Sequence, residues 1–295
     1  MKIGLTLPNV GLHVGKKQII ETAALAEKLE FDSIWTSDHL LVGRDYSSTF
    51  GKALECLATL SFLAGKTEHV SLGTGALILP MREVVLVAKQ ISSIQIFSSN
   101  RLLLGVGAGW NETEFENVRA PSFHDRGIYF DESLQLLKWL LKGNAEFSGE
   151  FYKINDGVFG PTPRKQIPIY IAGSGGQSLR RAAKLGDGWF PNGISVEAFS
   201  KGKSNLLKLT ARRMQFLLRM AVAFADKEKG LPSQAITSTG ELHTRLAGTP
   251  SEIIAQIVRY KKAGLDHLVC YFGDRDPGTL KVKIDEFAKS VLHSL

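Results

Sequence analysis

Short apolar runs alternate with longer amphipathic segments along the whole chain. The runs have the length of strands and are bounded by turn residues, a pattern typical of strands buried on both faces of a sheet. They predict eight strands, at residues 2–8, 33–38, 70–79, 102–111, 167–173, 188–191, 219–225 and 267–272. The segments between them predict helices at residues 16–30, 53–64, 84–97, 131–141, 177–185, 196–213 and 276–292, and one more helix that begins at a capping sequence, residues 249–252.

Strands that alternate with helices over 295 residues favour a (β/α)8 TIM barrel, an α/β fold. We expect one domain over residues 1–295, with an insertion around residues 112–166, where the strand–helix period lengthens. The polar stretch 226–248 is expected to be a lid or a mobile crossing loop. A doubly wound sheet is the alternative, but its G-x-G-x-x-G fingerprint belongs near the first strand, whereas this chain has G-x-G-x-G on the fourth.

Glycine turns follow three of the predicted strands. An apolar run leads into G-x-G at residues 72–76, 102–109 and 169–176. Without a Cβ, a glycine lets backbone N–H groups approach a ligand closely and form an anion-binding concavity. Packing of a narrowed strand is the alternative for any one of them. Their recurrence at intervals of one and two strand–helix units predicts a single barrel mouth that these turns share.

Composition limits the classes of function. The chain is 44% hydrophobic and 22% charged, has two cysteines, and contains no apolar run long enough to span a membrane, so we expect a cytoplasmic protein without disulfides. The formal net charge of +7 suggests an anionic partner. The basic residues between 201 and 219 lie on a predicted helix with few aromatic residues, which favours a solvated helix face over nucleic-acid binding. A phosphorylated small molecule suits the same charge.

The predicted carboxyl ends of the strands carry little side-chain chemistry. His39 is the one residue there that exchanges protons near neutral pH, which makes it the candidate catalytic residue. Asp38 and His39 are adjacent and point to opposite faces of a regular strand, so Asp38 is expected either at the ligand or as a group that caps a turn or orients a neighbour. Trp110 and Asn111 are expected in the substrate pocket, with plain packing as the alternative for Trp110. No Ser-His-Asp set and no metal-ligand spacing is found.

Several ordered blocks of sequence resemble the bacterial luciferase-like oxidoreductase superfamily, and most of all its branch that uses the 8-hydroxy-5-deazaflavin coenzyme F420. The blocks follow the family's order from the first strand to about Asn192, and the remaining third matches only in general layout. They read SIWTSDHL, VSLGTGALILP, AKQISSIQIFSSNRLLLGVGAGWNETEF, FHDRGIYFDE, PIYIAGSGG and KLGDGWFPN.

The resemblance implies a TIM barrel, coenzyme F420 or FMN as the carrier, and hydride chemistry. It places the coenzyme ring over the second to fourth strands, against Asp38, His39 and the Gly75–Ala76 segment, where the family often has a non-prolyl cis peptide bond. Two further segments of backbone are implied as coenzyme contacts. Ala108 and Gly109 meet the ring, and the phosphate lies in a cradle made by Gly173, Ser174, Gly175 and Gly176.

The chain departs from the family at two positions that concern the substrate. The branch that oxidises a sugar phosphate has a glutamate after the glycines of the fourth strand and a tryptophan five residues after the aspartate. This chain has Trp110 and Gly43 there. The departures argue against that particular dehydrogenase activity, although His39 is kept.

We therefore expect an oxidoreductase that transfers a hydride between a bound flavin or deazaflavin and a small organic substrate, with His39 donating or relaying a proton. With FMN, O2 as co-substrate would make it a monooxygenase. The alternatives are a flavin-binding protein without turnover and a TIM-barrel aldolase or isomerase of a phosphorylated small molecule. The expected partner is the small-molecule substrate, with no nucleic acid and no membrane, and a homodimer is left open.

Overall fold

Eight parallel strands close into a barrel. The computed structural model describes the chain except for residues 226–232, 238–239, 241 and 274–275. Each strand pairs with the next in chain order, and the last pairs back with the first, so the ring is complete. The strands are β1 (Lys2–Thr6), β2 (Ser33–Thr36), β3 (Ser71–Ile78), β4 (Leu102–Gly107), β7 (Ile169–Ala172), β8 (Gly188–Phe190), β9 (Gln215–Phe224) and β12 (His267–Tyr271). The predicted TIM barrel is confirmed.

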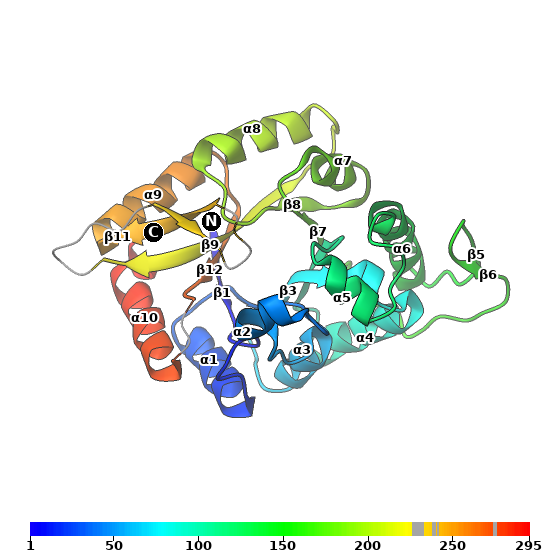
Figure 1. The fold of residues 1–295 in the computed structure, drawn as a ribbon, viewed down its shortest axis with the longest axis horizontal. Helices are drawn as coiled ribbons and strands as arrows, with labels where there is room; N and C mark the ends of the chain where they lie inside the picture. Colours follow the sequence, from blue (N-terminus) through cyan, green and yellow to red (C-terminus); the bar gives the residue numbers. More distant parts are fainter. Residues whose placement is uncertain (226–232, 238–239, 241, 274–275) are drawn as a thin grey trace.

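Helices surround this barrel, as Figure 1 shows. They are α1 (Lys16–Lys28), α3 (Cys56–Ala64), α4 (Val84–Phe97), α6 (Arg126–Leu141), α7 (Gly176–Leu185), α8 (Val196–Leu207), α9 (Pro250–Lys262) and α10 (Pro277–Ser290). The bounds of α4 agree with the prediction, because Glu83 caps its first turn by accepting from the Val85 N–H. Thr249 and Glu252 form the predicted capping box of α9. None of the helices in the described ranges is long and apolar enough to cross a membrane.

One expectation about the connecting segments needs correction. Residues 242–248 are not part of a loop, because Leu242–Gly248 forms strand β11, parallel to β9. The second half of β11, with Leu246 and Ala247, is buried against β9. The first half is mostly polar and more exposed. Strand β10 (Gln234–Ile236) pairs antiparallel with β11, and the rest of the expected lid, residues 226–232, 238–239 and 241, lies outside the described residues.

The expected insertion at residues 112–166 contains a regular barrel helix. Helix α6 begins at Arg126, five residues before the predicted start, and packs on α4 and α7. Around it lie the short helix α5 (Glu112–Asn117) and the hairpin of β5 (Phe147–Ser148) and β6 (Lys153–Ile154). Helix α8 ends at Leu207, earlier than predicted, and β9 begins at Gln215. The amphipathic pattern continues past Leu207, which is why the predicted helix extends to residue 213.

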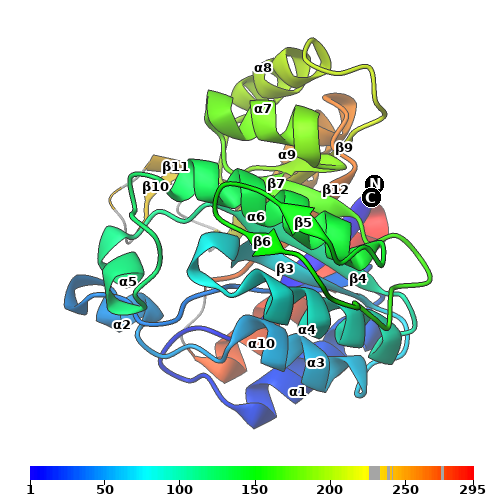
Figure 2. The ribbon, with the colours of Figure 1, turned by 90° about the vertical axis from the view of Figure 1, so that its right-hand side faces the viewer.

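The two ends of the barrel differ in what covers them. In Figure 2 both termini lie at the right, and α5, β10, β11 and the short helix α2 (Ser47–Phe50) lie at the left. Because parallel strands place all their carboxyl ends on one rim, the loops that follow the strands gather on this side. Figures 1 and 2 both show α5 beside α2, and the Asn117 side chain donates to the Leu41 carbonyl between them.

The inside of the barrel is filled by a small aromatic cluster. Trp35, Tyr170, Phe190, Leu217 and Val269 pack there, separate from the large core between strands and helices. Two strand glycines make room for it. A Cβ at Gly73 would lie 2.3 Å from the Trp35 ring, and one at Gly105 would lie 3.1 Å from the Phe190 ring and 2.2 Å from the Thr74 carbonyl oxygen. For these two glycines the packing interpretation is therefore right.

A buried histidine lies at the amino-terminal end of the barrel. His267 is 5% exposed, and its Nε2 is 2.8 Å from Ser33 Oγ, which also accepts from Trp35 Nε1–H. Burial, together with the positive charges of Lys2 and the chain's amino terminus, lowers the pKa of His267 from 6.5 to about 3. The ring is thus neutral in the folded protein over most of the acidic range.

This histidine predicts a pH-dependent stability. Between about pH 3 and 6.5 the unfolded chain binds a proton at His267 and the folded chain does not, so the free energy of unfolding rises with pH, by at most about 1.4 kcal/mol per pH unit from this one group. His267→Gln removes the proton site, and chemical denaturation from pH 4 to 7 should show a shallower slope than wild type. His69→Gln, with a side chain 86% exposed, is the matched control. Equal slopes for wild type and His267→Gln would contradict the assignment.

Candidate functional site

A cavity of about 1140 Å³ opens at the carboxyl ends of the barrel strands. Each of the eight strands, or the segment directly after it, contributes lining residues. The volume exceeds the range usual for pockets that hold one drug-sized ligand, so there is room for a coenzyme together with a substrate. The glycine turns that follow β3, β4 and β7 all reach this cavity, so the predicted shared mouth is present.

Most of the predicted site residues line the cavity, namely Asp38, His39, Gly75, Ala76, Ala108, Gly109, Trp110, Gly173 and Ser174. Asn111 is buried away from it. Its Oδ1 accepts a 3.2 Å hydrogen bond from the Glu114 N–H, so Asn111 is the N-cap of α5. Gly175 and Gly176 also lie outside the lining and begin helix α7.

The end of β3 has the backbone geometry that the family resemblance implied. The Gly75–Ala76 peptide bond is cis, and the pairing register between β3 and β4 shifts between Thr74 and Leu77. The Thr74 hydroxyl donates to the Gly105 carbonyl at 2.7 Å just before this bulge. The bulge brings the Gly75–Ala76 backbone into the cavity wall.

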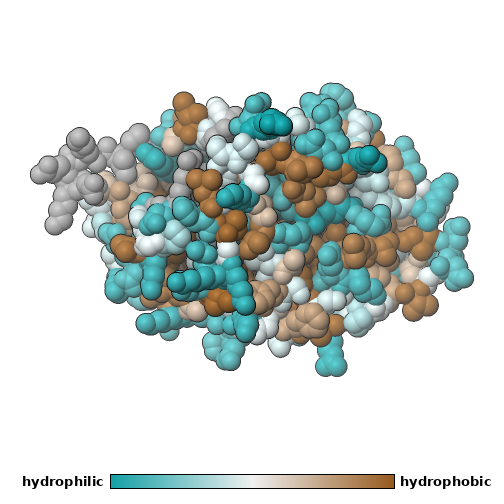
Figure 3. Space-filling model, turned by 60° about the horizontal axis from the view of Figure 1, so that its bottom comes forward, coloured by the Kyte–Doolittle hydropathy of each residue, from teal (hydrophilic) through white to brown (hydrophobic). Residues whose placement is uncertain are grey.

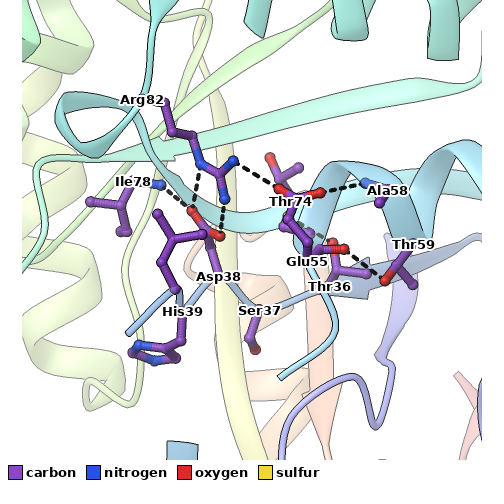
Figure 4. Close-up of polar contacts among 12 residues, drawn as sticks. Thr36, Ser37, Asp38, His39, Glu55, Ala58, Thr59, Thr74, Ile78 and Arg82 are labelled. Carbon is purple, nitrogen blue, oxygen red and sulfur yellow. Dashed lines mark hydrogen bonds and ion pairs between the residues drawn. The ribbon is translucent and has the colours of Figure 1, made fainter. Parts of the chain in front are cut away.

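The Asp38 carboxylate is held within the protein. Figure 4 shows it between the Ile78 N–H and the Arg82 guanidinium, with the His39 ring pointing away. Oδ2 accepts from Ile78 at 2.8 Å, and Oδ1 lies 2.5 Å from Arg82 Nη2. Arg82 also pairs with Glu55 at 2.7 Å, and Glu55 caps α3 through the Ala58 N–H. This set of contacts ties the end of β2 to the end of β3.

These contacts decide between the two roles expected for Asp38. Burial raises the pKa of Asp38, and Arg82 and the Ile78 N–H oppose that rise. Burial disfavours the Arg82 cation, but the carboxylates of Asp38 and Glu55 outweigh it and raise the pKa of Arg82. With both oxygens engaged, we interpret Asp38 as a residue that positions the β2 and β3 ends.

His39 forms a pair with a glutamate that the sequence analysis did not identify. Its Nδ1 lies 3.1 Å from Glu114 Oε2, and the other carboxylate oxygen accepts from the Leu40 N–H at 2.5 Å. Burial acts to raise the pKa of Glu114, but hydrogen bonds from His39 and Leu40 outweigh it, so the pKa lies below its ordinary value. An ionised Glu114 holds the proton on Nδ1 and leaves Nε2 for a ligand. The position of Glu114, shortly after the glycines at residues 105–109, is the sequence signal that could have identified it.

Aromatic rings enclose the His39 side chain. The Phe50 ring lies over it at 4.2 Å between centroids, and the Trp110 ring meets it edge-on at 6.1 Å. Tyr46 packs edge-on against Trp110 at 5.0 Å. Trp110 is 42% exposed and lines the cavity, so it is not buried in the core. Phe50 is the last residue of α2, and Tyr46 lies directly before that helix, in the segment between β2 and α3.

The amino end of α7 is built to receive an anion. Its N-cap, Gly175, has no side chain to bond the first amides of the helix, and a Cβ at this position would meet no atom within 4 Å. Gly173 before it has φ +109°, a left-handed conformation that favours glycine. Uncapped amides and the helix dipole attract negative charge. Arg126 also lines the cavity and adds positive charge, whereas the lining residue Arg181 is paired with Asp131 at 2.6 Å.

The fold and this site together define an enzyme of a known family. Residues 1–229 match the luciferase-like monooxygenase family, and the chain belongs to it. A relative from Amycolatopsis mediterranei, named F420-dependent glucose-6-phosphate dehydrogenase, is 26% identical over 95% of this chain and 95% of its own length.

Solved structures of other enzymes share the fold. One is an F420-dependent secondary alcohol dehydrogenase in complex with an F420-acetone adduct, with a TM-score of 0.81, 18% identity, and coverage of 99% of this chain and 98% of that one. Another is the oxygenating constituent of 3,6-diketocamphane monooxygenase from Pseudomonas putida in complex with FMN, with a TM-score of 0.77, 15% identity, and coverage of 99% and 98%. The resemblance and the class, an oxidoreductase of this family, are confirmed, and the names agree with F420 or FMN as the coenzyme.

The link between Asp38 and Arg82 predicts a large effect on stability. Arg82→Met leaves the Asp38 carboxylate buried without its counter-ion, which should lower the free energy of unfolding by about 3–5 kcal/mol. The double variant Asp38→Asn with Arg82→Met should lose less, because it removes both charges. Urea denaturation measures both, with the exposed Arg213→Met as control. A double variant no more stable than Arg82→Met would show that the buried charge is not the cause.

Proposed function

We propose that the protein transfers a hydride between a bound coenzyme, F420 or FMN, and a small organic substrate in this cavity. The observation that carries the proposal is the convergence of three features on one cavity. These are the ordered His39–Glu114 pair, the backbone bulge at Gly75–Ala76 and the uncapped amino end of α7. A proton-transfer group, a flat backbone surface and an anion cradle are what such a reaction requires from a protein.

The coenzyme would be held mainly by backbone. The amides at Gly173 to Gly176 would bind its phosphate, and the backbone at Gly75–Ala76 and Ala108–Gly109 would support its ring. Bound F420 or FMN supplies the hydride chemistry. The chain supplies the position of the ring, the walls that exclude water, and a proton at His39 Nε2. Asn111 would act only indirectly, as the cap that positions α5 and, through it, Glu114.

Relatives with F420 in their names favour F420 over FMN, and this choice decides the reaction class. Reduced FMN reacts with O2 and would support monooxygenation, whereas reduced deazaflavin does so poorly. Titration of the purified protein with each coenzyme, followed by O2 consumption of each reduced complex, tests the proposal. We expect stoichiometric binding of F420 and slow O2 consumption. Tight binding of FMN with rapid O2 consumption would make the protein a monooxygenase, and binding of neither coenzyme would refute the proposal.

His39 is predicted to affect turnover and not coenzyme binding. His39→Gln should lower kcat by roughly 10²–10⁴-fold while coenzyme affinity stays within a few-fold, because a general acid or base is lost. Glu114→Gln should have a smaller effect and shift the pH profile of turnover, as expected for a positioning residue.

The matched control for this pair is His124→Gln, an exposed histidine that also lines the cavity. It should leave kcat and the pH profile unchanged. Wild-type turnover in His39→Gln with a verified substrate would disprove the proton role.

The proposed phosphate site at the amino end of α7 is tested by a variant that should weaken coenzyme binding without destabilising the fold. Gly175 has the extended N-cap conformation and open space, so Gly175→Asp fits and should stabilise the helix by up to about 1 kcal/mol. The same carboxylate repels a phosphate, so coenzyme affinity should fall by about tenfold or more. Gly175→Ser, a neutral cap, should keep the affinity. Unchanged affinity in Gly175→Asp would place the phosphate elsewhere.

Two other functions are less well supported. An aldolase or isomerase would need a lysine or paired carboxylates at the strand ends, and the carboxylate found there, Asp38, is engaged by Arg82. A flavin-binding protein without turnover does not explain why Glu114 orders His39. Stoichiometric coenzyme binding with no turnover across a broad range of substrates would favour that alternative.

We also propose that the protein is cytoplasmic and forms a homodimer. Several apolar side chains reach the surface on the face shown in Figure 3, and on α4 Leu86 and Phe97 are each more than half exposed. Exposed apolar side chains that cluster on one face favour self-association. Light scattering on the purified protein, which gives the mass in solution, tests this.

A further inference from the structure

The cavity has two sides with different chemistry. The strands β2, β3, β4 and β7 follow one another in the sheet and carry the proposed coenzyme site. The strands β8, β9, β12 and β1 complete the ring, and Figure 1 shows β9, β11 and β12 to the left of β3. The second side presents polar side chains, from Thr6, Asn192, Arg219, His243, Thr244, Arg245 and Tyr271.

Arg219 projects from the inside of the barrel towards this side. It is two residues after Leu217 on β9, and Leu217 packs in the cluster inside the barrel, so both side chains leave the same face of the strand. Arg219 Nε donates to the Thr6 hydroxyl at 3.3 Å, and its guanidinium carbon lies 4.6 Å from the centre of the Tyr271 ring. The guanidinium lines the cavity above the aromatic cluster.

The Arg219 cation lacks a counter-ion in the part of the chain that the structure describes. Two other arginines near the cavity have carboxylate partners, Arg82 with Asp38 and Arg181 with Asp131 at 2.6 Å. A third, Arg126, donates to the backbone carbonyls of Gly109 and Phe123. Arg219 has a hydroxyl and a ring as its partners, and one of its five N–H groups is used. Burial lowers the pKa of Arg219, which reflects the cost of holding this charge away from water.

We propose that Arg219 binds an anionic group of the substrate, a carboxylate or a phosphate monoester, on the side of the cavity away from the coenzyme phosphate. The unused N–H groups form a planar fork that matches two oxygens of such a group. Asn192, which bridges to Arg219 through its backbone, and Thr6 add neutral polar groups beside it. The location of the coenzyme in this inference rests on the proposed function.

The coenzyme phosphate does not explain Arg219. Its cradle lies after β7, and β8 separates β7 from β9 in the barrel. The cavity therefore offers two anion sites, the amino end of α7 and the Arg219 fork. A substrate that reaches from His39 to Arg219 would carry its reacting carbon and its anionic group at different ends.

Titration calorimetry with inorganic phosphate and with benzoate as probes separates the two sites. In the protein without coenzyme, Gly175→Asp closes the α7 site and leaves the Arg219 site. Adding Arg219→Met to Gly175→Asp should then weaken the remaining binding of at least one probe by about tenfold or more. Adding Lys281→Met instead, at an exposed lysine of the cavity wall, should leave it unchanged and controls for net charge. Arg219→Lys, which keeps the charge and loses the fork, should be intermediate.

Two further readouts distinguish this inference from the proposed function. Coenzyme affinity of Arg219→Met should equal that of wild type, and its Tm should not fall, because an unpaired cation is removed from the barrel. Anion binding unchanged by Arg219→Met, a clear loss of Tm or a loss of coenzyme affinity would each overturn the role of Arg219. Loss of anion binding in Arg219→Met together with failure of the wild type to bind F420 or FMN would uphold the anion site and refute the coenzyme proposal.

Discussion

Closure of the parallel sheet is the constraint on which the site depends. Because β12 pairs with β1 and β8 pairs with β9, the carboxyl ends of all eight strands meet on one rim. Residues as distant in sequence as Thr6 and Arg219 then come within hydrogen-bond distance. The filled aromatic cluster below them gives the cavity a solid floor, so a ligand meets the strand ends and not the barrel interior.

Charge pairing at this rim separates residues that maintain the structure from residues that are available to ligands. Asp38, Arg82 and Glu55 satisfy one another and fix the ends of β2 and β3 beside α3. Glu114 is also committed, to His39 and the Leu40 N–H, and its effect is to leave one imidazole nitrogen for a ligand. Among the described residues, Arg219, Arg126 and the amino end of α7 are positive groups at the cavity without a carboxylate partner. In the proposed function, His39 is the proton-transfer group, and the amino end of α7 and Arg219 are the two positions suited to anions.

The sequence predicted the barrel well, because buried strands and amphipathic helices leave a strong periodic signal. It failed for β11, whose polar first half resembles a loop and which is recognisable as a strand only through its pairing with β9. It also could not separate packing glycines from site glycines. Gly73 and Gly105 face the Trp35 and Phe190 rings. Gly75 and Gly107, each two residues further along the chain, line the cavity.

The sequence predicted which residues lie at the candidate site, but it did not predict which side chains pair with them. His39, Asp38 and the glycine turns were identified from their places at strand ends. The partner of Asp38, Arg82, lies 44 residues away along the chain, and the partner of His39, Glu114, lies 75 residues away. Spacing in a single sequence does not reveal such contacts. Arg219 lies inside β9, which begins four residues earlier than the predicted strand 219–225. That it has no counter-ion among the described residues is visible only once the neighbouring strands are in place.

A crystal structure of the protein with F420 bound would test the central claim most directly. We expect the coenzyme phosphate at the first amides of α7, the ring against the Gly75–Ala76 backbone, and the reacting face open towards His39. A coenzyme bound outside the barrel mouth, or one whose phosphate lies on Arg219 in place of α7, would contradict it.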